Sequence, residues 1–179
     1  MNRALGLLAG ALLFVTFSGA MADQSDRRLG PLFDRLKAAT DTAEANEITT
    51  SIRSLWSVSG NEEADQLMAV GLGALRDGAV WDALRSFDLV VYRAPHYAEA
   101  YNMRATANFL MGNLPDAITN IERVLELEPR HFGALVGLGT VHLAMKDEAA
   151  ALAAFERALA INPHLKGARS RTKELRSRQ

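Results

Sequence analysis

The sequence predicts an all-α protein built as a stack of helix hairpins, and two observations support this. The residues Pro95, Pro129 and Pro163 lie 34 residues apart, and the segments between them carry apolar residues at helical spacing. Aligning each proline at position 32 gives three blocks, 64–97, 98–131 and 132–165. A single hairpin cannot bury its own apolar stripe, so the blocks are expected to pack on one another.

The N-terminus has the pattern of an export signal. Arg3 precedes an uncharged apolar run, residues 4–17, and the small residues Ala20 and Ala22 follow it. We expect cleavage after Ala22, which makes residues 1–22 a signal peptide of the bacterial type and the product periplasmic or secreted. The alternative is a retained anchor, but the run is shorter than the roughly 20 residues that span a bilayer. Residues 23–30 are expected to be a flexible segment.

Residues 31–60 predict a helix pair that does not match the repeat. The first helix opens at Pro31, and the second begins near Asp41, whose side chain can cap it. Both carry apolar residues at helical spacing, which are Leu32, Phe33, Leu36, Ile48, Ile52, Leu55 and Trp56. Because the ends of a solenoid need a polar outer face, this pair is expected to cap the first repeat.

The three blocks place small and large residues in register. Small residues recur at positions 8 and 20, and large ones at positions 4 and 24. Position 8 holds Gly71, Ala105 and Gly139, position 20 holds Ala83, Ala117 and Ala151, and position 24 holds Phe87, Ile121 and Phe155. Small residues let two helices approach closely, and the large residue fills the groove between them. Proline at position 32 ends the second helix.

At these positions the sequence resembles the tetratricopeptide repeat (TPR) family. The resemblance implies a right-handed α-solenoid of three TPR hairpins and a role in binding other proteins. Two departures stand out: Arg104 occupies an apolar position of the middle repeat, and the turn at Lys146 lacks the glycine expected at a helix C-terminus. Arg104 is expected to lay its aliphatic stem on the core with its head in water.

Residues 166–179 predict a basic C-terminal capping helix. It carries six cations against Glu174 alone, a net charge of +5, whereas residues 23–165 carry 13 basic and 20 acidic residues, a net −7. The cations are Lys166, Arg169, Arg171, Lys173, Arg176 and Arg178. They either solvate a capping helix that meets acidic repeats, or form a patch for anionic lipid head groups or an acidic partner.

No catalytic, metal or cofactor site is expected. The chain has no Cys, and its near-zero net charge argues against nucleic acid as a partner. Successive histidines among His96, His131 and His164 lie about one repeat apart, too far to share an ion, and His142 is expected in or near the core. The Gly-Leu-Gly segments at residues 71–73 and 137–139 lie inside predicted helices, so they are assigned to helix packing rather than to phosphate binding.

The first helices of the repeats are expected to line a concave groove. Positions 5, 9 and 12 point away from the core, and six of these nine residues are apolar. They are Met68, Leu72, Leu75, Asn102, Thr106, Phe109, Val136, Thr140 and Leu143. Adjoining helices or residues 23–30 could instead cover some of them.

The expected function is that of a non-catalytic adaptor or assembly factor of the bacterial envelope, which binds a peptide or helix of a partner protein in this groove. The alternative is a peripheral envelope-surface binder that acts through its basic tail. TPR proteins that hold the acidic C-terminus of heat-shock chaperones use Lys, Asn and Arg at set positions. This sequence has Met68, Leu72, Met103, Gly133 and Gly137 there, so that carboxylate clamp is absent.

Overall fold

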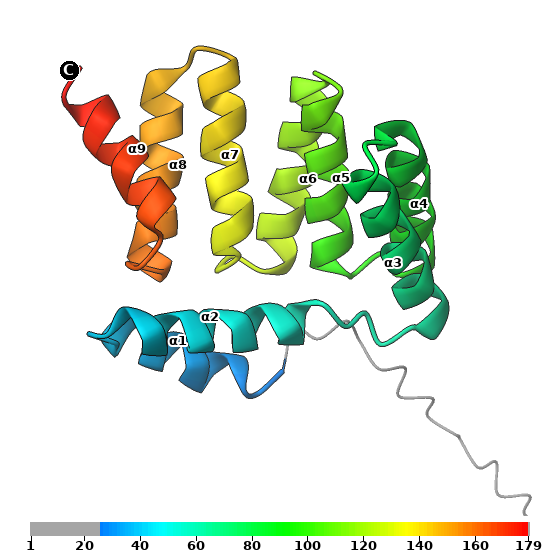
Figure 1. Cartoon of the computed structure of the whole chain (residues 1–179), viewed down its shortest axis with the longest axis horizontal. Coiled ribbons are helices and arrows are strands. Elements are labelled where there is room, and N and C mark those ends of the chain that lie inside the picture. The colour runs from blue at the N-terminus through cyan, green and yellow to red at the C-terminus, as the bar shows by residue number, and fades with distance from the viewer. Residues whose placement is uncertain (1–25, 179) are drawn as a thin grey trace, which may run out of the picture.

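The structure is a computed structural model that describes residues 26–178 (Figure 1). Over this range every regular element is an α-helix, which confirms the all-α solenoid. The elements are α1 (Leu29–Ala38), α2 (Thr42–Trp56), α3 (Glu62–Arg76), α4 (Val80–Arg93), α5 (Ala98–Leu110), α6 (Leu114–Leu127), α7 (Phe132–Ala144), α8 (Glu148–Ile161) and α9 (Lys166–Arg176). The predicted signal peptide lies outside the described residues.

The three repeats form hairpins that stack in chain order. Helices α3 and α4, α5 and α6, and α7 and α8 pair within the repeats, and each second helix contacts the first helix of the next repeat. Buried aromatic rings lie opposite helical glycines: a Cβ added at Gly71 would lie 2.5 Å from Phe87, and one at Gly139 would lie 2.6 Å from Phe155. The close approach predicted from positions 8 and 24 is therefore present.

The turn that ends α7 adopts a backbone conformation that elsewhere requires glycine. Gly78 and Gly112 follow α3 and α5 with φ angles of 75° and 79°, and Lys146 occupies the matching place after α7 with φ of 63°. A side chain in this left-handed region is tolerated at a modest cost. The turn after α7 therefore keeps the same backbone shape although lysine replaces glycine there.

The middle repeat accommodates Arg104 through polar contacts. Its Nε donates to Asn120 Oδ1 at 2.6 Å, and its guanidinium pairs with Asp88 at 3.2 Å. The guanidinium also lies 5.3 Å from the centre of the Tyr101 ring. Arg104 thus links α4, α5 and α6, whereas the sequence had predicted a head group in water.

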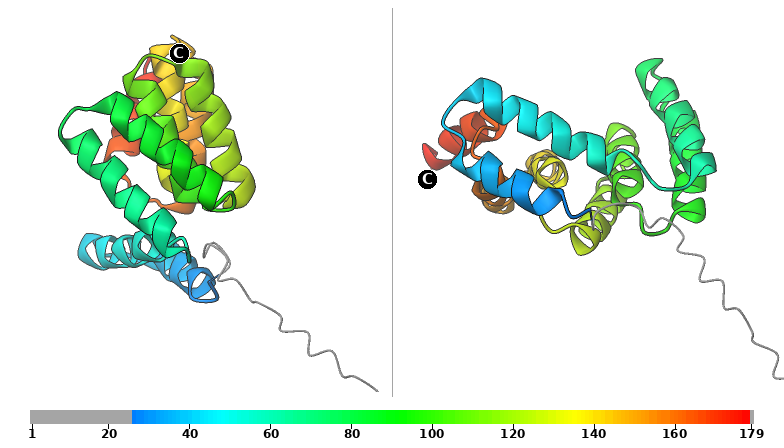
Figure 2. Two further views of the ribbon diagram at one scale, coloured as in Figure 1. Left: turned by 90° about the vertical axis from the view of Figure 1, so that its right-hand side faces the viewer. Right: turned by 90° about the horizontal axis from the view of Figure 1, so that it is seen from below.

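The N-terminal helix pair does not cap the first repeat, and that prediction was wrong. Helices α1 and α2 lie across the ends of the repeat helices, along the side where the inter-repeat turns gather (Figures 1 and 2). Their buried residues pack with Phe132, Ile161 and Leu165 of the third repeat rather than with α3. The pair buries its apolar stripe on the edge of the stack. The outer side of α3, including Val70, is consequently exposed.

The last residue of each repeat contacts this helix pair. Tyr97 donates its hydroxyl to the Ser57 carbonyl at 2.8 Å, the His131 ring stacks on Trp56 with centroids 4.3 Å apart, and Leu165 packs on the α1–α2 core. These three residues lie 34 residues apart, so each repeat ends with one side chain that anchors the helix pair. We call α1 and α2 together the strap.

Helix α1 begins earlier than predicted. It starts at Leu29, which is 1% exposed, and Pro31 lies within its first turn, where a missing N–H costs no hydrogen bond. Residues 29–30 are therefore part of the fold, in contrast to the flexible segment expected for 23–30. Residues 23–25 lie outside the described range.

Candidate peptide-binding groove

An apolar hollow lies between the first helices of the second and third repeats. It has a volume of about 260 Å³, and α5 and α7 form its walls, with Ile121 of α6 contributing to its lining. Its lining is Asn102, Ala105, Thr106, Phe109, Ile121, Gly133, Val136, Gly137, Thr140 and Val141. Apart from Asn102 and two threonines, these residues offer apolar surface, which suits the side chains of a bound segment.

Two glycines of α7 line the hollow. A Cβ added at Gly137 would meet only Ile121 Cδ1, at 3.6 Å, which is ordinary contact. Glycine is therefore not required there for packing, in contrast to Gly139, which lies two residues further along α7 on the core side. The absence of a side chain at Gly137 leaves room that a larger residue would fill.

A second, more polar cavity continues the hollow toward the strap. It has a volume of about 250 Å³ and shares Asn102 and Gly133 with the hollow. Its lining is Arg53, Trp56, Glu99, Asn102, Met103, His131, Phe132 and Gly133. We call it the middle section. Because Arg53 and Trp56 belong to α2, the strap forms one of its walls.

A hydrogen-bonded network fixes the side chains of the middle section. The Nδ1 atom of His131 accepts the Ala134 N–H at 3.0 Å and so caps α7, which places the ring proton on Nε2. His131 Nε2 then donates to Glu99 Oε2 at 2.9 Å, and Asn102 Nδ2 donates to the same carboxylate at 3.2 Å. Both polar ends of the His131 ring are thus used structurally. Asn102 lines both cavities, and no residue in the range 26–178 donates to its amide oxygen, which can therefore accept a backbone N–H.

The structure brings together five of the nine predicted groove residues: Asn102, Thr106, Phe109, Val136 and Thr140. The others lie elsewhere. Met68 is 5% exposed and belongs to the core of the first repeat, where Leu75 packs beside it. Leu143 packs toward α8 and α9. Leu72 is exposed but does not line the hollow.

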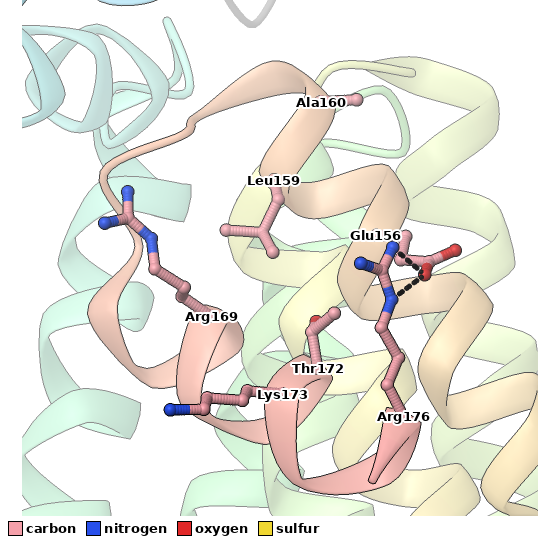
Figure 3. A pocket seen from close by; sticks show the side chains of 7 residues that line it. All are labelled: Glu156, Leu159, Ala160, Arg169, Thr172, Lys173 and Arg176. Carbon is pink, nitrogen blue, oxygen red and sulfur yellow. Dashed lines mark hydrogen bonds and ion pairs between the residues drawn. The ribbon is translucent and has the colours of Figure 1, made fainter. Parts of the chain in front are cut away.

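Half of the six cations in the basic patch predicted for the C-terminal helix pair with acidic neighbours. Arg176 pairs with Glu156 at 2.7 Å, Arg178 pairs with Glu148 at 2.7 Å, and Arg171 pairs with Glu174 at 3.1 Å. Figure 3 shows Arg176 reaching across to Glu156 of α8, while the head groups of Lys173 and Arg169 point away from this pair. Arg169 donates to the Pro163 carbonyl. These contacts match the capping-helix interpretation.

The remaining histidines are dispersed. His142 is half-buried on α7, and its Nδ1 lies 4.0 Å from Asp147. Among the described residues, no three His, Asp or Glu side chains are placed to hold a metal ion. Within residues 26–178 no helix combines the length and hydropathy needed to cross a membrane.

Comparison with known proteins decides the family. A TPR repeat-containing protein of Rhizobium etli is 39% identical over 137 residues, which is 76% of this chain and 67% of the relative. The protein belongs to the tetratricopeptide repeat family. The sequence model of that family, described as Tetratricopeptide repeat, matches residues 102–165, the segment that forms the hollow.

Other proteins are similar to this chain at lower identity. The Hsp70-Hsp90 organizing protein of Triticum aestivum is 32% identical over 104 residues, 58% of this chain and 18% of that protein. Among solved structures, the TPR2B domain of yeast Sti1 in a pHsp70 complex superposes with a TM-score of 0.63 at 19% identity, covering 66% of this chain and all of that one. MamA superposes with a TM-score of 0.61 at 22% identity, covering 81% and 82%.

Several residues of this TPR groove escaped prediction. The sequence predicted a helix-packing role for Gly137, which was wrong because a Cβ there would make only ordinary contact with Ile121. Two glycines four residues apart on one helix, Gly133 and Gly137, instead indicate an open surface. His131 was assigned no role, yet it joins the strap to the groove. The signal for His131 was its place at the end of a repeat, which it shares with Tyr97 and Leu165.

Proposed function

We propose that the protein is a non-catalytic adaptor or assembly factor of the bacterial envelope, which holds an extended peptide segment of a partner protein in the groove between α5 and α7. The observation that carries the proposal is the apolar hollow, which opens where Gly133 and Gly137 leave α7 without side chains. Asn102 lies where the hollow meets the middle section and can bond to the peptide backbone.

Solved TPR structures support peptide binding as the general activity. The titles of two neighbours describe a pHsp70 complex of yeast Sti1 and the first TPR of Spaghetti bound to an HSP90 peptide. Those ligands are not transferred here, because Met68, one of the clamp positions, is buried in the core and Gly133 and Gly137 provide no charge. The partner of this protein therefore has a different chemistry along the repeats.

The envelope location rests on the apolar run at residues 4–17 and the small residues before Asp23. Fractionation of the bacterium that produces the protein should recover it with the periplasm or medium, and mass spectrometry should find a mature chain that starts at Asp23. A full-length chain in the cytoplasm would contradict this part of the proposal.

Filling the hollow tests the binding function. Gly137→Leu places a side chain where only Ile121 is near, and replacing a helical glycine favours folding by up to about 1 kcal/mol. We expect this variant to fold at least as stably as the wild type and to lose partner binding. The readout is photo-crosslinking in living cells from a benzoylphenylalanine at Thr140, followed by mass spectrometry of the crosslinked product.

Gly73→Leu is the matched control, since Gly73 is also a helical glycine with open surroundings but does not line the hollow. It should leave the crosslink intact. A crosslinked partner that persists in Gly137→Leu would show that binding does not use the hollow.

Binding to the envelope surface through the basic tail is a weaker second candidate function, because three of the six arginine and lysine side chains of the tail pair with carboxylates.

A further inference from the structure

A third cavity lies at the junction between the strap and the turn that joins α8 to α9. Its volume is about 410 Å³, and it shares Arg53 with the middle section. Its lining is Asn46, Thr49, Thr50, Arg53, Asn162, His164, Leu165 and Lys166. We call it the basic pocket, because two cations and a histidine line it and its lining contains no Asp or Glu.

The two cations of the basic pocket have no counter-charge among the residues that the structure describes. Neither Arg53 nor Lys166 forms an ion pair with any residue in the range 26–178, in contrast to Arg171, Arg176 and Arg178 of the same end of the molecule. The Arg53 guanidinium lies 5.8 Å from the centre of the Phe132 ring, which supports its stem but supplies no counter-charge. Two charges in one cavity favour an anionic ligand.

The floor of the basic pocket is fixed by a buried amide. Asn162 is 1% exposed; its Nδ2 donates to Thr49 Oγ1 at 3.2 Å, and its Oδ1 accepts the His164 N–H at 3.0 Å. Thr49 uses an oxygen lone pair for this bond, and no described residue accepts its hydroxyl hydrogen, which is therefore available to a ligand. Arg53, Lys166 and Thr49 thus all present donors to the same space.

The three cavities are neighbours, which gives an extended segment a path along them. The hollow and the middle section share Asn102 and Gly133 in their linings, and the middle section and the basic pocket share Arg53. A segment that follows this path passes Glu99, whose negative charge disfavours a second carboxylate in the middle section. An acidic group is favoured only beyond it, where the lining contains no carboxylate.

We propose, on the basis of the groove function above, that the bound partner segment is apolar at one end and acidic at the other, and that the basic pocket binds its carboxylate. From Thr140 to Gly133 the axis of α7 advances about 10 Å, or about three residues of extended chain. Because the middle section adds to this span, the acidic residue lies at least about four positions from the apolar anchor. Carboxylate recognition is thus supplied by α2 and the start of α9, outside the repeat positions that form the chaperone clamp.

A random dodecapeptide library displayed on phage tests this directly. Selection on the wild-type protein should enrich peptides that combine apolar residues with Asp or Glu at that spacing, and Gly137→Leu should not retain them. Selection on Arg53→Gln with Lys166→Gln should still enrich the apolar residues but lose the acidic bias. A synthetic copy of one selected peptide should bind this double variant at least about tenfold more weakly than the wild type.

Matched controls separate charge at this site from charge in general. Arg171→Gln with Lys173→Gln removes two charges from α9 outside the basic pocket and should leave the affinity unchanged. Replacing the acidic residue of the peptide with its amide should weaken binding to the wild type but cause little further loss in the double variant, since both changes remove one interaction.

The outcomes distinguish the two proposals. Peptides that depend on Gly137 but show no acidic bias, or a loss of affinity equal to that of the α9 control, would overturn the carboxylate inference and leave the groove function standing. A library that yields no peptide sensitive to Gly137→Leu would overturn the groove function and this inference with it.

Discussion

Single residues set the distance between the two helices of each hairpin through the pair at positions 8 and 24. The first and third repeats combine glycine with phenylalanine, and the second combines Ala105 with Ile121. An added methyl group at Gly139 would lie within 2.8 Å of three atoms of the Phe155 ring, which is 2% exposed and cannot move aside. The smaller Ile121 side chain leaves room for the methyl group of Ala105.

We therefore expect Gly139→Ala to destabilise the protein by about 1–3 kcal/mol despite the better helix propensity of alanine. Combining it with Phe155→Ile recreates the pair of the second repeat, so the double variant should be more stable than the sum of the single effects predicts, by about 1 kcal/mol. Urea unfolding of the three variants measures this coupling. Strictly additive effects would show that the two positions do not determine the helix spacing.

Tyr97 makes the free energy of unfolding depend on pH in the alkaline range. Burial, and then the nearby carboxylates Glu99 and Asp65, raise the pKa of its hydroxyl well above the ordinary 10.0. A pKa raised by folding gives stability that is complete below the unfolded pKa and is lost as pH rises above it. Stability should therefore fall as pH rises above about 10.

In Tyr97→Phe this contribution to the alkaline loss should disappear, while neutral stability falls by about 1 kcal/mol because the Ser57 carbonyl loses its donor. Urea unfolding at about pH 8 and about pH 11 tests both parts. Tyr92→Phe is the control, since Tyr92 is 76% exposed. Equal pH dependence in the Tyr97 variant and the wild type would refute the assignment.

Among the elements, the strap holds its place through aromatic contacts. Trp56 packs on His131, on Phe132 with centroids 5.2 Å apart, and on Phe33 at 5.9 Å. Trp56→Ala should cost about 3–5 kcal/mol, and hydrogen exchange should accelerate in α1 and α2 more than in α4 to α8. Trp81→Ala, at an exposed site of α4, should change stability by no more than about 0.5 kcal/mol. Uniform acceleration in all helices would show that the strap is not a separable unit.

The position of the strap could not be predicted, although its helices could. The apolar stripes of α1 and α2 and the cap at Asp41 follow from local sequence, and the Asp41 side chain accepts backbone N–H groups as expected. A stripe shows that a helix buries one face but not which surface covers it. The same limit affected the groove: Met68 and Asn102 hold the same position in their repeats, yet neighbouring residues bury only Met68.

In the whole molecule, the strap connects repeats that would otherwise contact only their neighbours. Each repeat has one contact of this kind: Tyr97 donates to the Ser57 carbonyl directly after α2, His131 stacks on Trp56, and Asn162 donates to Thr49. Unfolding should therefore be a single transition rather than a gradual loss of terminal repeats. In the Trp81→Phe variant Trp56 is the only tryptophan, so tryptophan fluorescence reports on the strap. This fluorescence should change at the same urea concentration as the far-UV circular dichroism. Fluorescence that changes first would mean that the strap detaches before the stack unfolds.

A stack of helical repeats in which only neighbours touch is flexible, because the angle between neighbouring repeats can change slightly and these changes add along the stack. Here α2 and the residue that follows it contact the end of every repeat, so the relative tilt of the repeats is set before any partner arrives. A peptide would then enter a channel of predetermined width, and little of its binding free energy would be spent on reshaping the receptor.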